Sequence, residues 1–86
     1  MTHEIKIREE YADAVLSGEK SFEVRENDRG YQKGDTVHFH VICNLGLPLR
    51  HPLNDREFLI TYVLSGWGLK ENWVAFSIKR VDEVTE

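Results

Sequence analysis

The sequence is poor in cysteine and has no long apolar run. Its single cysteine, Cys43, cannot form an intrachain disulfide, and a metal site built from several cysteines is excluded. The longest nearly unbroken apolar run, residues 58–64, is far shorter than the roughly 20 residues that cross a bilayer. The first residues also lack the charged and then apolar pattern of a signal peptide. We therefore expect a cytoplasmic protein without membrane contact.

An excess of positive charge is also missing. The chain carries 11 lysine and arginine residues against 15 aspartate and glutamate residues, a net charge of -4, and the two signs alternate along the sequence. Proteins that hold nucleic acid by neutralising many phosphates usually have a basic face. We therefore expect any nucleic-acid contact to be local and to depend on a few placed groups.

The chain of 86 residues is long enough for one hydrophobic core and too short for two. Hydrophobic residues make up 41% and charged residues 30% of it, which are ordinary values for a globular domain. No internal repeat or low-complexity linker interrupts the sequence. We predict a single domain over residues 1–86, and the sequence leaves its oligomeric state open.

Alternation of apolar and polar residues is the main secondary-structure signal. In residues 21–26 it places Phe22 and Val24 on the core side and Glu23 and Arg25 on the outer face. The run 58–64 is apolar on both faces and is predicted to be the most buried strand. Altogether, strands are expected at residues 3–7, 21–26, 36–42, 58–64 and 73–81.

One helix is expected at residues 9–17. Tyr11, Ala14 and Val15 follow helical spacing, and Gly18 supplies a stop. A helix this short is marginal alone and must pack on the sheet. With short connections and little βαβ rhythm, the order of elements predicts an α+β fold: a mostly antiparallel β-barrel with the N-terminal helix packed on it. Closing the barrel would remove the exposed edges of a small sheet.

The densest polar constellation surrounds Lys20, Glu23 and Arg25. Strand periodicity puts Glu23 and Arg25 on one face, about 6 to 7 Å apart, and the long stem of Lys20 can reach the same face. A carboxylate beside a lysine can hold the ammonium in place or accept its proton, and a guanidinium suits a phosphate or a base edge. Asp28 and Arg29 follow within reach. If Lys20 and Arg25 hold a ligand, we expect alanine at either position to abolish binding or hydrolysis of that ligand and to leave stability nearly unchanged, because exposed charges contribute about 0 to 1 kcal/mol to folding. The alternative is a solvated outer face without a functional role.

The run Gly18-Glu19-Lys20-Ser21-Phe22-Glu23-Val24-Arg25 resembles the G-x-K-x-x-E-x-R signature of ASCH domains in the PUA-like superfamily. Most of the remaining chain is similar to a small bacterial and phage group of this superfamily without known function, through residues 3–7, 27–29, 34–35, 61–64 and 68–69. The resemblance implies a PUA-like barrel that binds RNA or a small nucleotide or nucleoside without a cofactor. It also implies a cleft that the signature lines. We expect the ligand-binding residues of this cleft to be Lys20, Glu23, Arg25, Asp28 and Arg29.

The same resemblance implies an enzymatic alternative. Some ASCH-like proteins are amidohydrolases that remove the acetyl group from N4-acetylcytidine with a lysine, a threonine and a glutamate. Lys20 matches the lysine, but Glu23 occupies the threonine position, so Lys20 and Glu23 would be the catalytic residues only if this chain is an enzyme. Ser21 offers a hydroxyl at a different place, and the remote glutamate could be Glu57 or Glu71. The acidic total charge favours a small ligand over long RNA, and the missing threonine disfavours the known amidohydrolase chemistry, so binding is the first expectation.

Two histidines invite interpretation as a metal site. His38 and His40 share a strand face at i and i+2, but a zinc site needs a third ligand. No such ligand is spaced for it, and Cys43 falls on the opposite face. We therefore expect solvent-facing histidines and no metal.

Several aromatic and polar residues have two interpretations. Trp67, Trp73 and Tyr31 could stack on bases, although aromatic residues near loops more often plug the end of a small barrel. His3 and Lys6 could line the cleft if the first strand neighbours the signature strand. The plug is the favoured expectation for the aromatic residues, whereas the position of His3 and Lys6 stays open.

Overall fold

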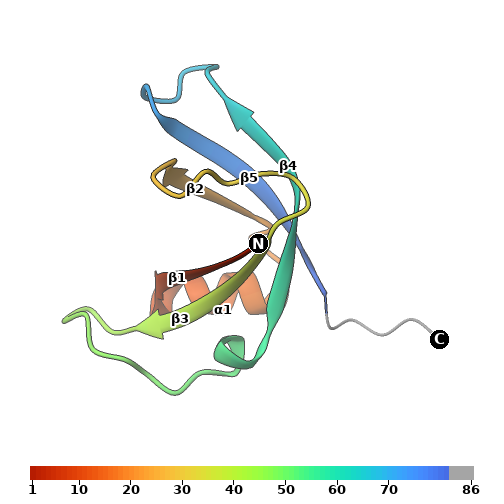
Figure 1. Cartoon of the computed structure of the whole chain (residues 1–86). Helices are drawn as coiled ribbons and strands as arrows, with labels where there is room; N and C mark the ends of the chain where they lie inside the picture. The colour runs from red at the N-terminus through yellow and green to blue at the C-terminus, as the bar shows by residue number, and fades with distance from the viewer. Residues whose placement is uncertain (82–86) are drawn as a thin grey trace.

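Five strands and one α-helix follow one another in the predicted order. The computed structural model describes residues 1–81 (Figure 1). A short 3₁₀ helix within the irregular segment before the fourth strand was not predicted. The elements are β1 (Thr2–Arg8), α1 (Glu9–Ser17), β2 (Phe22–Glu26), β3 (Thr36–Ile42), η1 (Pro52–Asp55), β4 (Glu57–Ser65) and β5 (Trp73–Arg80).

The strands form one curled sheet in the order β1-β3-β4-β5-β2. The β3–β4, β4–β5 and β5–β2 pairs are antiparallel, whereas β1 and β3 run parallel. The predicted small, mostly antiparallel barrel-like fold is confirmed as a half-barrel with one parallel pair. Figure 1 shows the curl, with β1 and β2 as the edge strands.

Arginine side chains connect the two edge strands. Arg25 of β2 donates from Nη2 to the carbonyl oxygen of Lys6 on β1 at 2.8 Å, and Arg29 donates to the carbonyl oxygen of Glu4. Two carbonyl groups at the β1 edge thereby receive donors that a neighbouring strand would otherwise supply. Among residues 1–81, guanidinium groups and no backbone ladder connect β1 with β2 and with the loop that follows β2.

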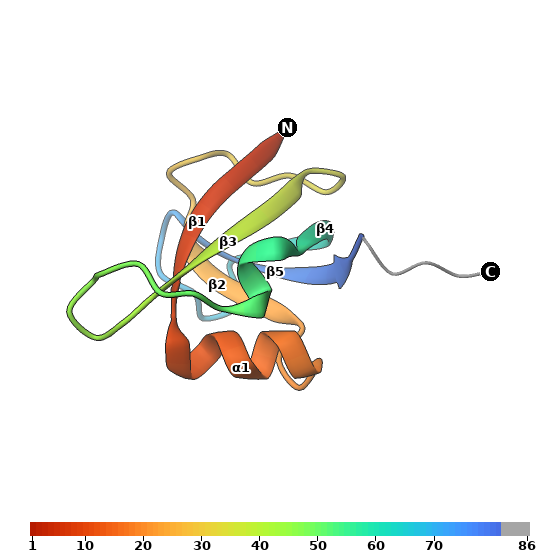
Figure 2. The same cartoon turned by 90° about the horizontal axis from the view of Figure 1, so that it is seen from below.

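The core lies inside the curl and under the helix. Helix α1 contacts β1, β3 and η1, and Figure 2 shows it beside the curled sheet. Ala12 and Val15 are its buried residues, and Gly18 ends it in the left-handed region at φ 90°. Within residues 1–81, no helix is long and apolar enough to cross a membrane. The buried apolar side chains are Ile5, Ile7, Ala12, Val15, Tyr31, Val37, Phe39, Val41, Leu53, Phe58, Ile60, Val74, Phe76 and Ile78.

The predicted inner and outer faces of β2 are reversed in the structure. Phe22 and Val24 are 48% and 43% exposed, whereas Glu23 is only 3% exposed. Pairing with β5 explains the difference, because Glu23 lies opposite the core residue Phe76. Residues directly opposite each other in an antiparallel pair share a face. The more apolar inner face of β5 therefore determines which side of β2 is buried.

The prediction that residues 58–64 form the most buried strand is also wrong. Phe58 and Ile60 are buried, but Tyr62 is 61% exposed. A register shift lies between Ile60 and Tyr62, and β3 pairs only with the first part of β4. The second part of β4 has β5 as its sole strand partner among the described residues and so lacks cover on one side.

Candidate functional site

The carboxylate of Glu23 is the centre of a three-residue charge cluster. Lys20 Nζ binds Glu23 Oε2, and Arg25 approaches Oε1 with Nε at 2.9 Å and Nη2 at 2.8 Å. The structure therefore brings Lys20, Glu23 and Arg25 together, as strand spacing predicted for Glu23 and Arg25 and the signature for Lys20. We call these three residues the Lys20 triad.

The end of α1 fixes the position of Lys20. Gly18 adopts positive φ, and the amide of Lys20 then donates to the carbonyl oxygen of Ala14 at 3.0 Å. This bond ties the start of the signature strand to the last turn of the helix. The ammonium group also lies 5.8 Å from the ring centre of Tyr11 and 5.2 Å from that of Phe22, within the range of cation–π attraction.

Burial makes the triad a structural element as well as a candidate site. Glu23 is almost fully buried, and Lys20 and Arg25 keep only 21% and 28% of their side-chain surface exposed. A buried carboxylate needs charged or hydrogen-bonding partners, and removing one partner leaves an uncompensated charge. The expectation that alanine at Lys20 or Arg25 would leave stability unchanged is therefore inconsistent with this burial.

The triad lines a cleft of about 530 Å³, which we call the Lys20 cleft. Four cationic side chains face it, from Lys6, Arg8, Lys20 and Arg25, against two anionic ones, from Glu23 and Glu26. The cleft thus carries a net formal charge of two positive units on a chain whose total is -4. Two aromatic residues, Tyr11 and Trp73, also line the cleft. The full lining of the Lys20 cleft is Lys6, Ile7, Arg8, Tyr11, Lys20, Glu23, Val24, Arg25, Glu26, Ile42 and Trp73.

A second hollow of about 780 Å³, the Arg29 groove, adjoins the Lys20 cleft. The two share Lys6, Arg25, Glu26 and Ile42. Asp28 and Arg29 line this groove and are absent from the lining of the Lys20 cleft. The predicted site residues therefore divide between two neighbouring hollows. In the groove the three lysine and arginine side chains are balanced by three carboxylates, from Glu4, Glu26 and Asp28.

Sequence reasoning missed Arg8 and Tyr11 and left Lys6 open. Lys6 and Arg8 are exposed residues of β1, and Tyr11 is an exposed residue at the start of α1. The outward alternation of Lys6 and Arg8 was a usable signal. Their approach to the signature strand depends on the curl of the sheet, which places the two edge strands side by side.

His3 and the aromatic residues divide between core and cleft. His3 is buried, binds Asp35 Oδ2 through Nε2 at 2.8 Å and packs 4.7 Å from Tyr31, so it lines neither hollow. This hydrogen bond lowers the pKa of Asp35. Tyr31 is buried as the plug expectation required, and burial raises the pKa of its hydroxyl. Trp67 is 89% exposed and is no plug, whereas Trp73 is half-buried and lines the Lys20 cleft.

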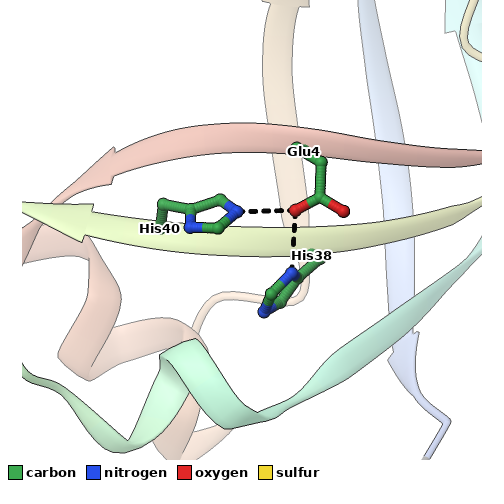
Figure 3. A group of neighbouring side chains, drawn as sticks. All are labelled: Glu4, His38 and His40. Carbon is green, nitrogen blue, oxygen red and sulfur yellow. Dashed lines mark hydrogen bonds and ion pairs between the residues drawn. The ribbon is translucent and has the colours of Figure 1, made fainter.

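A third ligand does lie beside the two histidines. The parallel pairing of β1 and β3 places Glu4 opposite His38 and near His40. Glu4 Oε1 lies 2.8 Å from His38 Nδ1 and 2.6 Å from His40 Nε2 (Figure 3). Hydrogen bonds with His40 and His38 lower the pKa of Glu4. The pKa of His38 is raised by its hydrogen bond to the carbonyl oxygen of Asn54 and, to a smaller extent, by its hydrogen bond to Glu4. The argument that no third ligand is available is therefore wrong, because sequence spacing could not reveal the β1–β3 pairing.

The candidates for completing a hydrolytic site lie outside the Lys20 cleft. Ser21 lines a different hollow, which it shares with Lys20, Ile78 and Arg80. Glu57 lines a hollow beside His38 and Asn54. Glu71 is an exposed residue of the segment between β4 and β5. Among the described residues, none of these three lines the Lys20 cleft.

Comparison with known proteins finds a matching family, a relative in sequence and a solved structure with a similar fold. Residues 2–78 match the family described as "Domain of unknown function (DUF3850)". The chain is 47% identical over 38 residues to the "Uncharacterized 12.9 kDa protein in GpA 3'region" of Escherichia phage P2, a match that covers 44% of this chain and 35% of that protein. The chain thus spans about a third of the length of this curated relative. The crystal structure of "hypothetical protein PH0355" covers 94% of this chain and 100% of its own at a TM-score of 0.61, and its 18% identity indicates a shared fold alone.

Proposed function

We propose that this chain, which belongs to the DUF3850 family of domains of unknown function, binds a small nucleotide or an unpaired RNA base in its Lys20 cleft. The observation that carries the proposal is the sign of the charge. A net positive cleft on a net acidic domain attracts an anionic group to one place, whereas the rest of the surface does not favour long nucleic acid. The resemblance of the signature run to ASCH domains supports the same ligand class.

In this proposal the cationic side chains of the cleft bind the phosphate group. Glu23 already occupies donors of Lys20 and Arg25, so these two side chains are held in place and keep part of their donor capacity. Lys6 and Arg8 are exposed at the wall of the same cleft. They supply additional charge, and a phosphate placed among the four groups receives charge-assisted hydrogen bonds.

In this proposal the aromatic side chains of the cleft bind the base. Tyr11 is 49% exposed and Trp73 half-buried, so both have ring surface available to a ligand. Stacking of a base on an aromatic ring contributes about 1 to 3 kcal/mol and tolerates any base. A nucleotide therefore fits both features of the cleft, and inorganic phosphate fits only the charge.

An amidohydrolase is the second candidate, and the contact between Lys20 and Glu23 favours it. A carboxylate in direct contact with an ammonium group can accept its proton and leave an amine that acts as a base or nucleophile. The absence of Ser21, Glu57 and Glu71 from the described lining of the Lys20 cleft argues against it. We therefore rank binding without turnover first. A cytoplasmic location is part of the same proposal.

The test is a titration with nucleoside monophosphates and with short single-stranded RNA, in which calorimetry measures the affinity. We expect Lys6→Gln and Arg8→Gln each to weaken binding about three- to tenfold, because each removes one charge near the phosphate. Lys33→Gln is the matched control, since Lys33 is exposed in a loop and belongs to neither hollow. Unchanged affinity in both cleft variants, or an equal loss in the control, would show that the Lys20 cleft is not the binding site.

Hydrolysis of N4-acetylcytidine by the wild-type protein distinguishes the two candidates. The binding proposal predicts no release of acetate. Release that stops in Lys20→Met but continues in Lys33→Gln would identify the amidohydrolase instead.

A further inference from the structure

The outer face of the β1–β3 pair carries a compact group of metal-ligating side chains, Glu4, His38 and His40 (Figure 3). One oxygen and two ring nitrogens, one from each residue, all lie within 4.8 Å of one another. The side chains come from two strands that are far apart in the sequence and paired in register, with Glu4 opposite His38. The cluster lies outside the Lys20 cleft and has no part in the proposed nucleotide binding.

The far side of His38 is held as it is in many metal sites. Its Nε2 lies 2.6 Å from the carbonyl oxygen of Asn54, which leaves Nδ1 directed at Glu4. Metal-ligating histidines almost always donate their second ring nitrogen to a carbonyl or carboxylate, which fixes the tautomer and the ring. Asn54 is itself fixed, because its side chain donates to Leu49 and accepts from the amide of Val41.

We propose that Glu4, His38 and His40 form a binding site for a divalent transition-metal ion of the zinc type. Two imidazole nitrogens and one carboxylate oxygen form a donor set that zinc uses with the fourth position open. Other first-row ions that accept imidazole also suit this set, so zinc serves as the probe. The inference does not depend on the proposed nucleotide binding.

Binding an ion requires the ligand atoms to move. The carboxylate of Glu4 must move away from the rings, and the two ring nitrogens, which lie within 4.8 Å of each other, must take up the spacing that the ion sets. Tetrahedral zinc with bonds of about 2.0 to 2.1 Å holds its ligand atoms roughly 3.3 Å apart. Glu4 Oε1 is now 2.8 Å and 2.6 Å from the two ring nitrogens, so the carboxylate must move away by about half an ångström. Glu4 is 57% exposed, and its side chain has the freedom to do so. The ion then takes the place of the direct contacts between the carboxylate and the two ring nitrogens.

The position of the cluster gives the ion an accessible side. Glu4 and His40 both line the Arg29 groove, and the His40 side chain is 51% exposed. Three protein ligands leave one position of a four-coordinate ion for water or for a group bound in the groove. The site therefore has the character of an exchangeable ion site, in contrast to a closed structural one.

Zinc titration of the chelator-treated full chain by calorimetry tests the proposal. We expect one zinc ion per chain, and a loss of affinity of about tenfold or more in Glu4→Gln and in His40→Gln, because each removes a direct ligand. Asp13→Asn is the matched control, since Asp13 Oδ1 pairs with His51 Nε2 at 2.7 Å elsewhere on the surface. It should leave zinc affinity unchanged.

Imidazole NMR signals of the wild-type chain provide a second readout that needs no variant. Zinc should shift the ring signals of His38 and His40 and leave those of His51 in place. Absence of saturable binding, unchanged affinity in both cluster variants, an equal loss in Asp13→Asn, or ring shifts centred on His51 would each overturn the proposal.

Discussion

At the scale of single residues, Glu23 shows how a charged side chain can occupy a core-facing position. It is 3% exposed, and Lys20 and Arg25 supply its charge partners. Arg25 also donates to the carbonyl oxygen of Lys6, so one side chain stabilises both the buried carboxylate and the contact between the edge strands. The triad therefore links folding to the shape of the cleft.

The first prediction concerns this link. Arg25→Met keeps the aliphatic bulk but leaves Glu23 with one charge partner and the Lys6 carbonyl without its guanidinium donor. We expect the free energy of unfolding to fall by about 2 to 4 kcal/mol, measured by urea denaturation. Lys33→Met, at an exposed loop position, should change it by no more than about 0.5 kcal/mol. An Arg25→Met variant as stable as the wild type would contradict the structural role of the triad.

The second prediction concerns Asp35 and pH. Its hydrogen bond with His3 lowers its pKa below the ordinary value of 3.8, so the folded state releases this proton more readily than the unfolded state. The resulting stability is fully present above the ordinary value and is lost as the pH falls through the lowered folded pKa. Asp35→Asn should therefore flatten the decline of unfolding free energy in urea titrations from about pH 5 to pH 2. Equal slopes in both proteins would refute this role.

At the scale of elements, alternation and glycine placement predicted the order and approximate bounds of the strands and of α1. Alternation could not predict which face of β2 is buried, because the pairing of Glu23 with Phe76 decides it. Alternation predicted the shared face of Glu23 and Arg25, whereas the position of Lys20 beside them was predicted from the reach of its long side chain and from the signature. The approach of Glu4 to His38 was not, because it depends on the parallel pairing of β1 with β3.

The third prediction concerns the end of α1. Gly18 has φ 90°, and a Cβ there would meet nothing within 4 Å, so the cost of a side chain is conformational and not steric. We expect Gly18→Ala to lower the free energy of unfolding by about 1 kcal/mol and Gly18→Asn to lower it less, because asparagine tolerates the left-handed region. Thermal or urea unfolding measures both. An alanine variant at least as stable as the asparagine variant would contradict this account of the helix end.

At the scale of the whole molecule, a small acidic domain concentrates positive charge in one cleft. The cleft could not be located from composition, because β1 supplies Lys6 and Arg8 while the chain after α1 supplies Lys20 and Arg25. Only the curl of the sheet brings these two segments together, through the bond from Arg25 to the backbone of Lys6.

The most direct test of nucleotide binding in the Lys20 cleft is backbone and indole NMR during titration with a nucleoside monophosphate. We predict saturable shifts of the Lys6 and Arg8 amides and of the Trp73 indole N–H, because these groups belong to the walls of the cleft. Gly46 and Tyr31, which line only the Arg29 groove of the two hollows, should shift little. Shifts centred on Gly46 and Tyr31, or no saturable shift at any of these groups, would contradict the account.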